Sequence, residues 1–424
     1  MKYLKLFKMH SEYEEYINGR RAVFPNVSYT EDTLKVYYKL IPHDYSKDYF
    51  TMRVTVGGDV TWTGKNNNAL YYSKDNGKTW SEPSTNITLS VNEGDKVLWK
   101  GETSLINIEG IGVFNGSTDV RYTVEGNVMS LLFGDDFKGQ TSLEGKSYAF
   151  YKLFYNNKNI TSAEKLSLPA TTLADSCYYS MFSGCTSLTT APELPATTLA
   201  DSCYQYMFYS CTSLTTAPEL PATTLADRCY SGMFGGCTSL TTAPELPATT
   251  LANYCYSNMF GGCTSLVTAP ELLATTLADR CYSSMFNGCT SLTTAPELPA
   301  TTLANSCYES MFHSCTSLTT APELPATALA DRCYSSMFNG CTSLTTAPEL
   351  PATTLADNCY GYMFNGCTKL NYIKCLATDI SASGCRNKWV TNVASTGTFV
   401  KATGMTSWPN GTSGIPTGWT VVDA

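Results

Sequence analysis

Residues 177–202 read CYYSMFSGCTSLTTAPELPATTLADS, and this stretch recurs almost unchanged through the second half of the chain. Its first cysteine returns at Cys203 and then every 26 residues as far as Cys359, while a second cysteine series runs from Cys185 to Cys367. Eight near-identical copies of one unit therefore follow one another. Self-similarity at a fixed period of this length predicts a repeat architecture in which each unit packs on its neighbours.

Comparison of the copies separates constant from variable positions. Counting from the first cysteine as position 0, positions 0, +1, +4, +5 and +8 are always Cys, Tyr, Met, Phe and Cys, whereas −1, +2, +3, +6 and +7 change. At 100° per residue the constant positions share one side of a helix, so we expect a short amphipathic helix of about two to three turns in each unit. Asp or Asn at −2, as in Asp175, Asp201, Asn253 and Asn305, is the expected N-cap, and Gly at +7 would end the helix in six copies.

The second half of the unit carries a proline on either side of Glu193. Because proline cannot donate to a sheet ladder, we expect only a very short parallel strand over residues 188–191, followed by an extended segment. A 26-residue unit of short strand plus helix has the geometry of a leucine-rich repeat. Stacked at about 4.8 Å per strand, the units would form a solenoid on the order of 40 Å long.

Degenerate copies are expected at both ends of the array. Cys385 lies 26 residues after Cys359, with Trp389 where the other units have Met. Upstream, Phe154 and Ile160 match Phe182 and Leu188 at an offset of 28, which indicates a leading copy with a two-residue insertion. Atypical end copies are what closing the core of a solenoid requires.

All 18 cysteines lie between Cys177 and Cys385. Two cysteines eight residues apart on a helix are too distant for a disulfide, whereas stacked equivalents in neighbouring units are near enough, so inter-repeat disulfides stay open. No CxxC or Cys/His pairing indicates zinc. We expect buried free thiols, with a structural core ladder formed by Cys177, Cys203, Cys229, Cys255, Cys281, Cys307, Cys333 and Cys359.

The first part of the chain has a different pattern. A strand over residues 3–9, a helix that starts at a capping box of Ser11 and Glu14 and ends at Asn18-Gly19, and strands around Val23 and Val36 are predicted for the opening segment. Residues 44–133 then alternate short strands with turn signals, as in YFTMRVTV, DVTWTG, ALYYS, NITLSV and KVLWKG. This alternation is typical of an all-β sandwich.

One motif in this region resembles an enzyme element. Residues 73–80, SKDNGKTW, match the S-x-D-x-G-x-T-W Asp-box of sialidases, in which the Asp ties a hairpin turn. Only one copy is present, and no propeller repeat accompanies it. We therefore interpret the motif as a structural turn, and a glycan contact is the alternative.

Charge excludes some functions and leaves others open. The chain carries 15% charged residues and a net charge of −8, which disfavours nucleic-acid binding. It contains no run of about 18 apolar residues, so we expect no membrane-spanning helix. The opening residues also lack the apolar stretch of a secretory signal. Residues 166–367 hold 14 acidic and 3 basic residues. Seven glutamates in register, from Glu193 to Glu349, are expected to form a solvated stripe, with calcium binding as the alternative.

The variable positions supply the candidate ligand-facing surface. Exposed variation on a rigid scaffold is how solenoids build binding surfaces, although drift on an unconstrained surface gives the same pattern. The candidates are the bulky or polar residues at these positions: Tyr179, Gln205, Tyr206, Tyr209, Asn258, Glu309, His313 and Tyr362.

Two resemblances extend this interpretation. The core M-F-x-x-C-T-S-L, which begins at Met181, resembles the A-F-x-x-C-x-x-L core of the BspA-like leucine-rich repeat surface proteins over about residues 150–385, although this unit is longer than the usual family repeat. The segment with Trp389, Trp408 and Trp419 is similar to the closing segment of such proteins in gut bacteria. Separately, KYLKLFKMHSEYEEYINGRRAVFPNVSY at the start of the chain resembles a leader of gut bacteriophage virion proteins.

The expected fold is mainly β with short helices. We predict an N-terminal anchor (1–43), a β-sandwich (44–135), an N-terminal capping repeat (136–176), a leucine-rich-repeat solenoid (177–385) and a C-terminal cap (386–424). No nucleophile and base pair, phosphate loop or metal cluster emerges, so we expect a protein with no catalytic residue, cofactor or metal.

The resemblances imply a bacteriophage virion adhesion protein. Its N-terminal region would dock onto other virion proteins in many copies or as a homo-oligomer, and its solenoid would bind a host or gut surface glycan or protein. The alternative is a BspA-like adhesin of the bacterial cell surface, for which the missing secretory signal is the discriminator. A third alternative, a glycan hydrolase, rests on the Asp-box alone.

Overall fold

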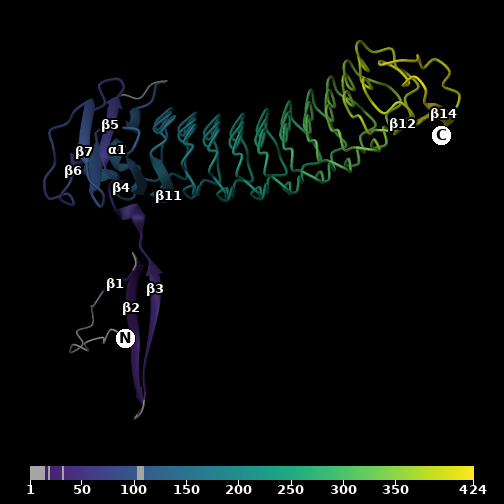
Figure 1. Ribbon diagram of the computed structural model, residues 1–424. Helices are drawn as coiled ribbons and strands as arrows, with labels where there is room; N and C mark the ends of the chain where they lie inside the picture. Colours follow the sequence, from purple (N-terminus) through teal and green to yellow (C-terminus); the bar gives the residue numbers. More distant parts are fainter. Residues whose placement is uncertain (1–14, 18–19, 31–32, 103–108) are drawn as a thin grey trace.

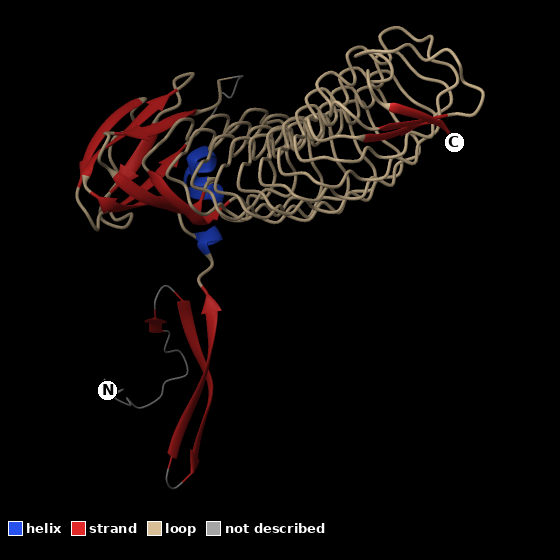
Figure 2. Cartoon of the chain, turned by 45° about the vertical axis from the view of Figure 1, so that its right-hand side comes forward, coloured by secondary structure: helices blue, strands red, loops and turns tan. Residues whose placement is uncertain are grey.

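The computed structural model describes residues 15–17, 20–30, 33–102 and 109–424. A long β-ribbon leaves a two-sheet domain, and the array of repeats runs away from that domain in a gentle curve that ends near the C-terminus (Figure 1). Strands concentrate in the N-terminal part, whereas the array consists almost entirely of turns and loops (Figure 2). No helix among the described residues is long and apolar enough to cross a membrane.

The N-terminal ribbon is a three-stranded antiparallel sheet of β1 (Glu15–Ile17), β2 (Arg20–Thr30) and β3 (Thr33–Pro42). The two longer strands confirm the strands predicted around Val23 and Val36. The predicted helix is wrong over Glu15–Ile17, because these residues pair with β2 in the register Glu15↔Ala22 instead of continuing from the capping box. The strand predicted over residues 3–9 lies outside the described residues.

The two-sheet domain contains every strand that the alternating pattern predicted. One sheet has the order β11-β10-β4-β8-β6 and the other β7-β5-β9. The strands and short helices are η1 (Tyr45–Lys47), β4 (Phe50–Val56), β5 (Gly58–Gly64), β6 (Leu70–Ser73), β7 (Asn86–Val91), β8 (Lys96–Gly101), β9 (Gly112–Gly116), β10 (Arg121–Asn127), α1 (Ser130–Phe133), η2 (Gly134–Phe137) and β11 (Ile160–Ser167).

Aromatic side chains join the two sheets. Phe114 of β9 lies 5.5 Å from Phe50 and 5.1 Å from Trp99, ring centre to ring centre, and both partners belong to the larger sheet. Phe114 also lies 5.9 Å from Phe154, which belongs to the leading copy of the repeat. The domain and the array therefore share one continuous apolar core.

Strand β11 makes the junction between domain and array. It pairs in parallel with β10 in the register Tyr122↔Ile160, and on its other side Thr189 donates its N–H to the carbonyl of Thr161 at 3.0 Å. The leading copy thus supplies both an edge strand of the sheet and the first layer of the array. Its core residue Phe154 stacks on Phe182 at 5.0 Å, as the 28-residue offset predicted.

The repeat array (residues 142–392) contains no α-helix, so the amphipathic helix predicted for each unit is wrong. Positions −1, +3 and +7 have positive φ in every copy, for example 54° at Ser176, 52° at Ser180 and 77° at Gly184. An α-helix requires negative φ throughout. Each unit instead folds as consecutive four-residue turns, which bring two residues of every four to the inside.

Backbone hydrogen bonds explain how these turns are held. Alternate N–H groups bond within the unit, as when Met181 donates to the carbonyl of Tyr178 at 3.1 Å. The N–H groups between them bond to the next unit, as when Tyr178 donates to the carbonyl of Cys203 at 2.9 Å. Both sets of N–H donors therefore have hydrogen-bond partners, which buried backbone groups require and which a helix would otherwise provide.

The constant side chains form ladders along the core. The Tyr rings at +1 stack on those of the next copy, with Tyr230 and Tyr256 5.9 Å apart, and the Phe rings at +5 do the same, with Phe234 and Phe260 5.8 Å apart. The Tyr, Phe, Met and Cys members of the eight copies are buried. Stacked ring pairs stabilise beyond the area they bury, by about 0.5–1.5 kcal/mol each.

All 18 cysteines are free and buried, which confirms the expected thiols and excludes inter-repeat disulfides in this structure. The second series also makes directed contacts, because the Cys263 thiol donates to the carbonyl of Phe234 at 3.1 Å and its equivalents repeat the bond. Burial raises the pKa of the Cys177 thiol to about 12. These thiols therefore stay protonated near neutral pH and behave as small core groups.

The Asp and Asn residues at −2 do not cap helices. Their side chains reach the next unit instead: Asp201 Oδ1 accepts the N–H of Asp227 at 3.1 Å, and Asp227 Oδ1 accepts the N–H of Asn253 at 3.0 Å. The short polar side chain serves one orphan backbone donor, as an N-cap would, but the donor belongs to the neighbouring copy.

The proline-containing half of each unit makes only isolated parallel bridges. The strand predicted over residues 188–191 is reduced to one bridge, Thr190↔Thr216, and a second row includes Thr198↔Thr224. Full strands form only near the ends, in β11 and β12 (Tyr372–Cys375).

The C-terminal part closes the core. Parallel strands β12, β13 (Thr398–Lys401) and β14 (Thr420–Asp423) form a small sheet. Trp389 takes the place of Met in the last copy and stacks on Tyr360 at 6.2 Å, and Trp408 stacks on Trp389 at 5.8 Å. Two indole rings therefore cover the end of the Tyr ladder.

Candidate ligand-binding surface

The variable positions face outward because the turns have a period of four. Positions 0 and +1, +4 and +5, and +8 point into the core, and the intervening positions −1, +2, +3, +6 and +7 form a surface that we call the turn face. The eight residues predicted as ligand-facing all lie there. Tyr209 is 39% exposed, and the other seven are partly exposed: Tyr179, Gln205, Tyr206, Asn258, Glu309, His313 and Tyr362.

Three of these residues belong to one aromatic group, which we call the tyrosine cluster (Tyr148, Tyr151, Tyr179, Tyr206 and Tyr209). The ring centre of Tyr151 lies 5.8 Å from that of Tyr148 and 5.2 Å from that of Tyr179. The ring centre of Tyr206 lies 5.8 Å from that of Tyr179 and 5.6 Å from that of Tyr209. The cluster spans the leading copy and the first two full copies. Burial raises the pKa of the Tyr179 phenol, which keeps it neutral.

Lysine and glycine residues complete the surroundings of the cluster. Lys152 Nζ lies 5.0 Å from the ring centre of Tyr151 and 4.8 Å from that of Tyr155. On the opposite side, a Cβ on Gly232 would collide with the Tyr206 ring.

A second glycine leaves room in the same way. A Cβ on Gly235 would lie 2.9 Å from the ring of Tyr209, closer than real Cβ contacts. Gly at +3 occurs in one of the eight copies, directly after the copy with Tyr206 and Tyr209. The ring of Tyr206 therefore lies over the one unit that has glycine at +3.

The remaining predicted residues lie apart from the cluster. Asn258 lies near it, with Nδ2 3.4 Å from a Cβ built on Gly235. Glu309 Oε2 lies 4.0 Å from Arg280, and Ser314 hydrogen-bonds to His313 Nδ1 at 3.0 Å. Tyr362 accepts a hydrogen bond from Asn387 near the C-terminal end. The eight residues therefore do not form a single site.

The Asp-box folds as a turn held by its own residues. Asp75 Oδ1 accepts the N–H of Thr79 at 3.0 Å, and Oδ2 accepts the Thr79 hydroxyl at 2.7 Å. Ser73 Oγ accepts the N–H of Gly77 at 2.9 Å. These bonds lower the pKa of Asp75 to about 2, so both carboxylate oxygens are engaged in holding the hairpin.

The glutamate stripe is exposed along the array, as predicted. Its last member, Glu349, forms an ion pair with Lys374 at 3.0 Å. Across the described ranges no group of three His, Cys, Asp or Glu side chains is placed to hold a metal ion. Calcium binding along the stripe stays a prediction.

Sequence reasoning missed two groups. Tyr148, Tyr151 and Tyr155 belong to the leading copy, where the two-residue insertion shifts the numbering, although the offset of 28 places Tyr151 directly over Tyr179. Arg228 and Tyr254 occupy position −1, which was recognised as variable but contributed no candidate.

The repeats also match a known family. The profile of the BspA type Leucine rich repeat region matches residues 146–282 and 279–383, in 6 copies, which is more than half of the chain. The chain belongs to this family. Membership in the BspA type leucine rich repeat family indicates a surface-exposed or adhesive repeat protein. No significant match was found among curated proteins or among solved structures.

Proposed function

We propose that this BspA type protein is a non-enzymatic adhesin whose turn face binds a glycan or protein on a host or gut surface. The tyrosine cluster carries the proposal. Tyrosine offers a large, rigid and amphipathic contact at low entropic cost, and a group of partly exposed rings can pack against the apolar face of a sugar while the phenol groups bond to its hydroxyls.

The N-terminal ribbon supports attachment to a larger assembly. Strands β2 and β3 extend away from the two-sheet domain (Figure 1), and among the described strands these two pair only with each other and with the short strand β1. A narrow ribbon is marginally stable alone, and its open edges invite pairing with another chain. The ribbon therefore provides a docking element, with the two-sheet domain as spacer and many copies per particle.

For the assembly we propose a bacteriophage virion, as the resemblance of residues 2–29 to virion leaders suggests, and the bacterial cell surface is the alternative. Mass spectrometry of purified phage particles is expected to detect peptides of this chain in stoichiometric amounts. Detection in bacterial outer-membrane fractions but not in particles would overturn the virion proposal and leave the adhesin.

The tyrosine cluster gives a direct test of adhesion. The triple variant Tyr179→Ser, Tyr206→Ser and Tyr209→Ser is expected to reduce binding to a host glycan array or mucin by more than about tenfold, since loss of anchoring aromatic residues costs about 2 kcal/mol or more. Serine is already present at each of these positions in other copies, so the fold should be retained. Full-length protein and biolayer interferometry provide the measurement.

Tyr362→Ser is the matched control. It makes the same change at position +3, outside the cluster, and is expected to bind like the unmodified protein. Equal binding by the triple variant and the control would rule out the cluster as the site.

A further inference from the structure

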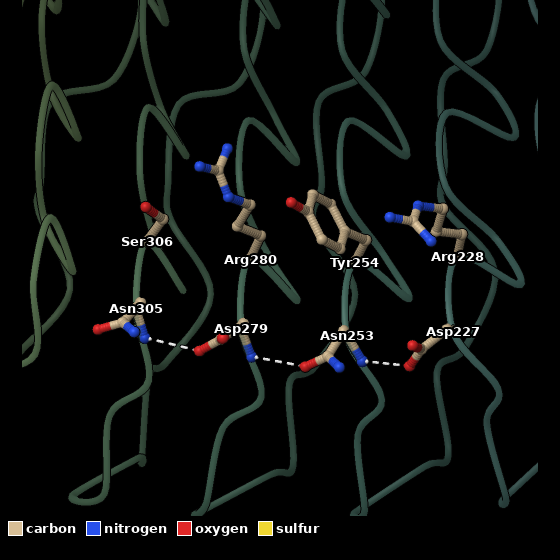
Figure 3. Close-up of a pocket in the computed structure, with 8 residues that line it drawn as sticks. All are labelled: Asp227, Arg228, Asn253, Tyr254, Asp279, Arg280, Asn305 and Ser306. Atoms are coloured by element: carbon tan, nitrogen blue, oxygen red, sulfur yellow. Dashed lines mark hydrogen bonds between the residues drawn. The ribbon is translucent and has the colours of Figure 1, made fainter.

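A second candidate site, lined mainly by polar side chains, lies on the array along positions −2 and −1. It is an open hollow of about 360 Å³ that crosses four successive copies (Figure 3). Its lining consists of Asp227, Arg228, Asn253, Tyr254, Asp279, Arg280, Asn305 and Ser306. Each copy therefore contributes one Asp or Asn and one larger or hydroxyl side chain.

Tyr254 holds two arginines in place. The guanidinium carbons of Arg228 and Arg280 lie 4.7 Å and 5.6 Å from its ring centre, and the three side chains form a row in the order Arg280, Tyr254, Arg228 (Figure 3). Cation–π contacts of this kind fix the guanidinium groups. Less conformational entropy then remains to be lost when a ligand binds.

The guanidinium donors are available to a ligand. Within the described part of the chain, the guanidinium group of Arg228 makes no hydrogen bond or ion pair, and the nearest carboxylate to Arg280 is Glu309 at 4.0 Å. Arginine presents a planar fork of donors that matches a carboxylate or sulfate.

The acidic residues of the hollow have a different role. Oδ1 of Asp227 accepts the N–H of Asn253, and Oδ1 of Asp279 accepts the N–H of Asn305, both at 3.0 Å (Figure 3). The second oxygen of each carboxylate makes no hydrogen bond among the described residues and can accept from hydroxyl groups. The hollow thus presents paired charges of both signs rather than a basic patch.

We propose that this hollow binds a linear saccharide in which acidic and neutral sugars alternate. The arginines occupy every second copy, at Arg228, Arg280 and Arg332, and a copy advances by about 4.8 Å, so charged contacts recur about every 10 Å. Acidic sugars meet the arginines, and the hydroxyls of the neutral sugars meet the Asp and Asn side chains. A simple polyanion lacks hydroxyl donors for these carboxylates and is repelled by them. The inference rests on the proposed adhesion and names its ligand class.

The test compares two forms of one ligand. Calorimetry of the full chain with an unsulfated chondroitin oligosaccharide, in which uronate and neutral sugar alternate, is expected to show binding that falls by at least about tenfold when the carboxylates are methyl-esterified. The same loss is expected for Arg228→Ser with Arg280→Ser, which places at −1 the residue that Ser202 and Ser306 already provide with positive φ.

Three further variants separate the effect of charge from that of position. Lys369→Ser removes one exposed positive charge elsewhere and restores the residue of the other copies, so affinity should not change. Tyr254→Phe keeps the ring between the arginines and should bind normally, whereas Tyr254→Ser should bind several-fold more weakly. Equal binding of the acid and its ester, or undiminished binding by the double arginine variant, would overturn the site. Competition by inorganic polyphosphate as strong as by the oligosaccharide would show an unselective anion site and would overturn the saccharide assignment.

The two proposals fail separately. If the arginine variant loses oligosaccharide binding but the unmodified full protein does not adhere to host surfaces, the adhesin proposal is wrong and the saccharide site is retained. Adhesion that depends on the tyrosine cluster, with no binding of the acidic oligosaccharide, would do the reverse.

Discussion

Raising the pH from 8 to 10 is expected to unfold the repeat array cooperatively. The cause is the burial of cysteine thiols, which raises the pKa of Cys177 and Cys229 to about 12 from an ordinary value of 9.0. In the unfolded chain these thiols ionise above about pH 9, while the folded array keeps them protonated. The unfolded state then binds fewer protons, so stability falls as pH rises through this window and is unaffected below it.

The size of the effect follows from the number of thiols. Each buried thiol lowers the free energy of unfolding by about 1.4 kcal/mol for every pH unit above the pKa that it has in the unfolded chain. The eight copies contain sixteen such thiols. The summed loss of about 20 kcal/mol per pH unit exceeds the total free energy of unfolding of a typical domain, which is about 5–15 kcal/mol. The buried Tyr phenols at +1, whose pKa burial also raises, add to the loss above about pH 10.

Circular dichroism and thiolate absorbance during a titration under reducing conditions provide the measurement. Both signals should change together at one midpoint, and return to pH 7 should restore the fold. Thiolate absorbance that rises near pH 9 while the circular dichroism stays native would contradict the prediction, because the thiols would then be accessible in the folded state.

The core of the array was predictable from sequence, but its backbone was not. Constant positions 0, +1, +4, +5 and +8 correctly identified the buried Cys, Tyr, Met and Phe side chains. The same set fits a helix of 3.6 residues per turn and a turn ribbon with a period of four, and a helical projection over nine residues cannot separate them. Bonds to the neighbouring copy, which a single unit does not contain, select the ribbon.

The sequence nevertheless held a signal for the turns. Positions −1, +3 and +7 never carry Val, Ile, Thr or Pro in any of the eight copies. These residue types are the ones that tolerate positive φ least. In the N-terminal segment no such signal existed, because the capping box is local and the pairing of Glu15 with Ala22 is not.

The candidate surface was predicted in part for a related reason. Variation between copies found Tyr179, Tyr206 and Tyr209, because these residues differ from the serines of other copies. Contact between copies decides which of them cooperate, and contact with Gly232 and Gly235 depends on the neighbouring unit. Tyr362 satisfies the sequence criterion equally well but has no partner ring among the described tyrosines.

Replacing one ring of the Phe ladder should divide the array. Phe260 is fully buried and stacks on Phe234 at 5.8 Å and on Phe286 at 5.7 Å. Phe260→Ala keeps the backbone bonds, including the donation from the Cys289 thiol to its carbonyl, but leaves a cavity between two stacked rings. We expect a loss of about 3–5 kcal/mol.

This loss falls on two neighbouring interfaces, and in a stacked repeat protein the units contact only their neighbours. Urea unfolding followed by circular dichroism should therefore shift to lower midpoint and separate into two transitions, and hydrogen exchange should show the copies on either side of residue 260 opening first. Val267→Thr in the same copy is the control. Val267 is 51% exposed and stands where most copies have Thr, so its replacement should change stability by less than about 0.5 kcal/mol. If both variants unfold in one transition at the same midpoint, the ladder does not carry the cooperativity of the array, and the bonds between backbones do.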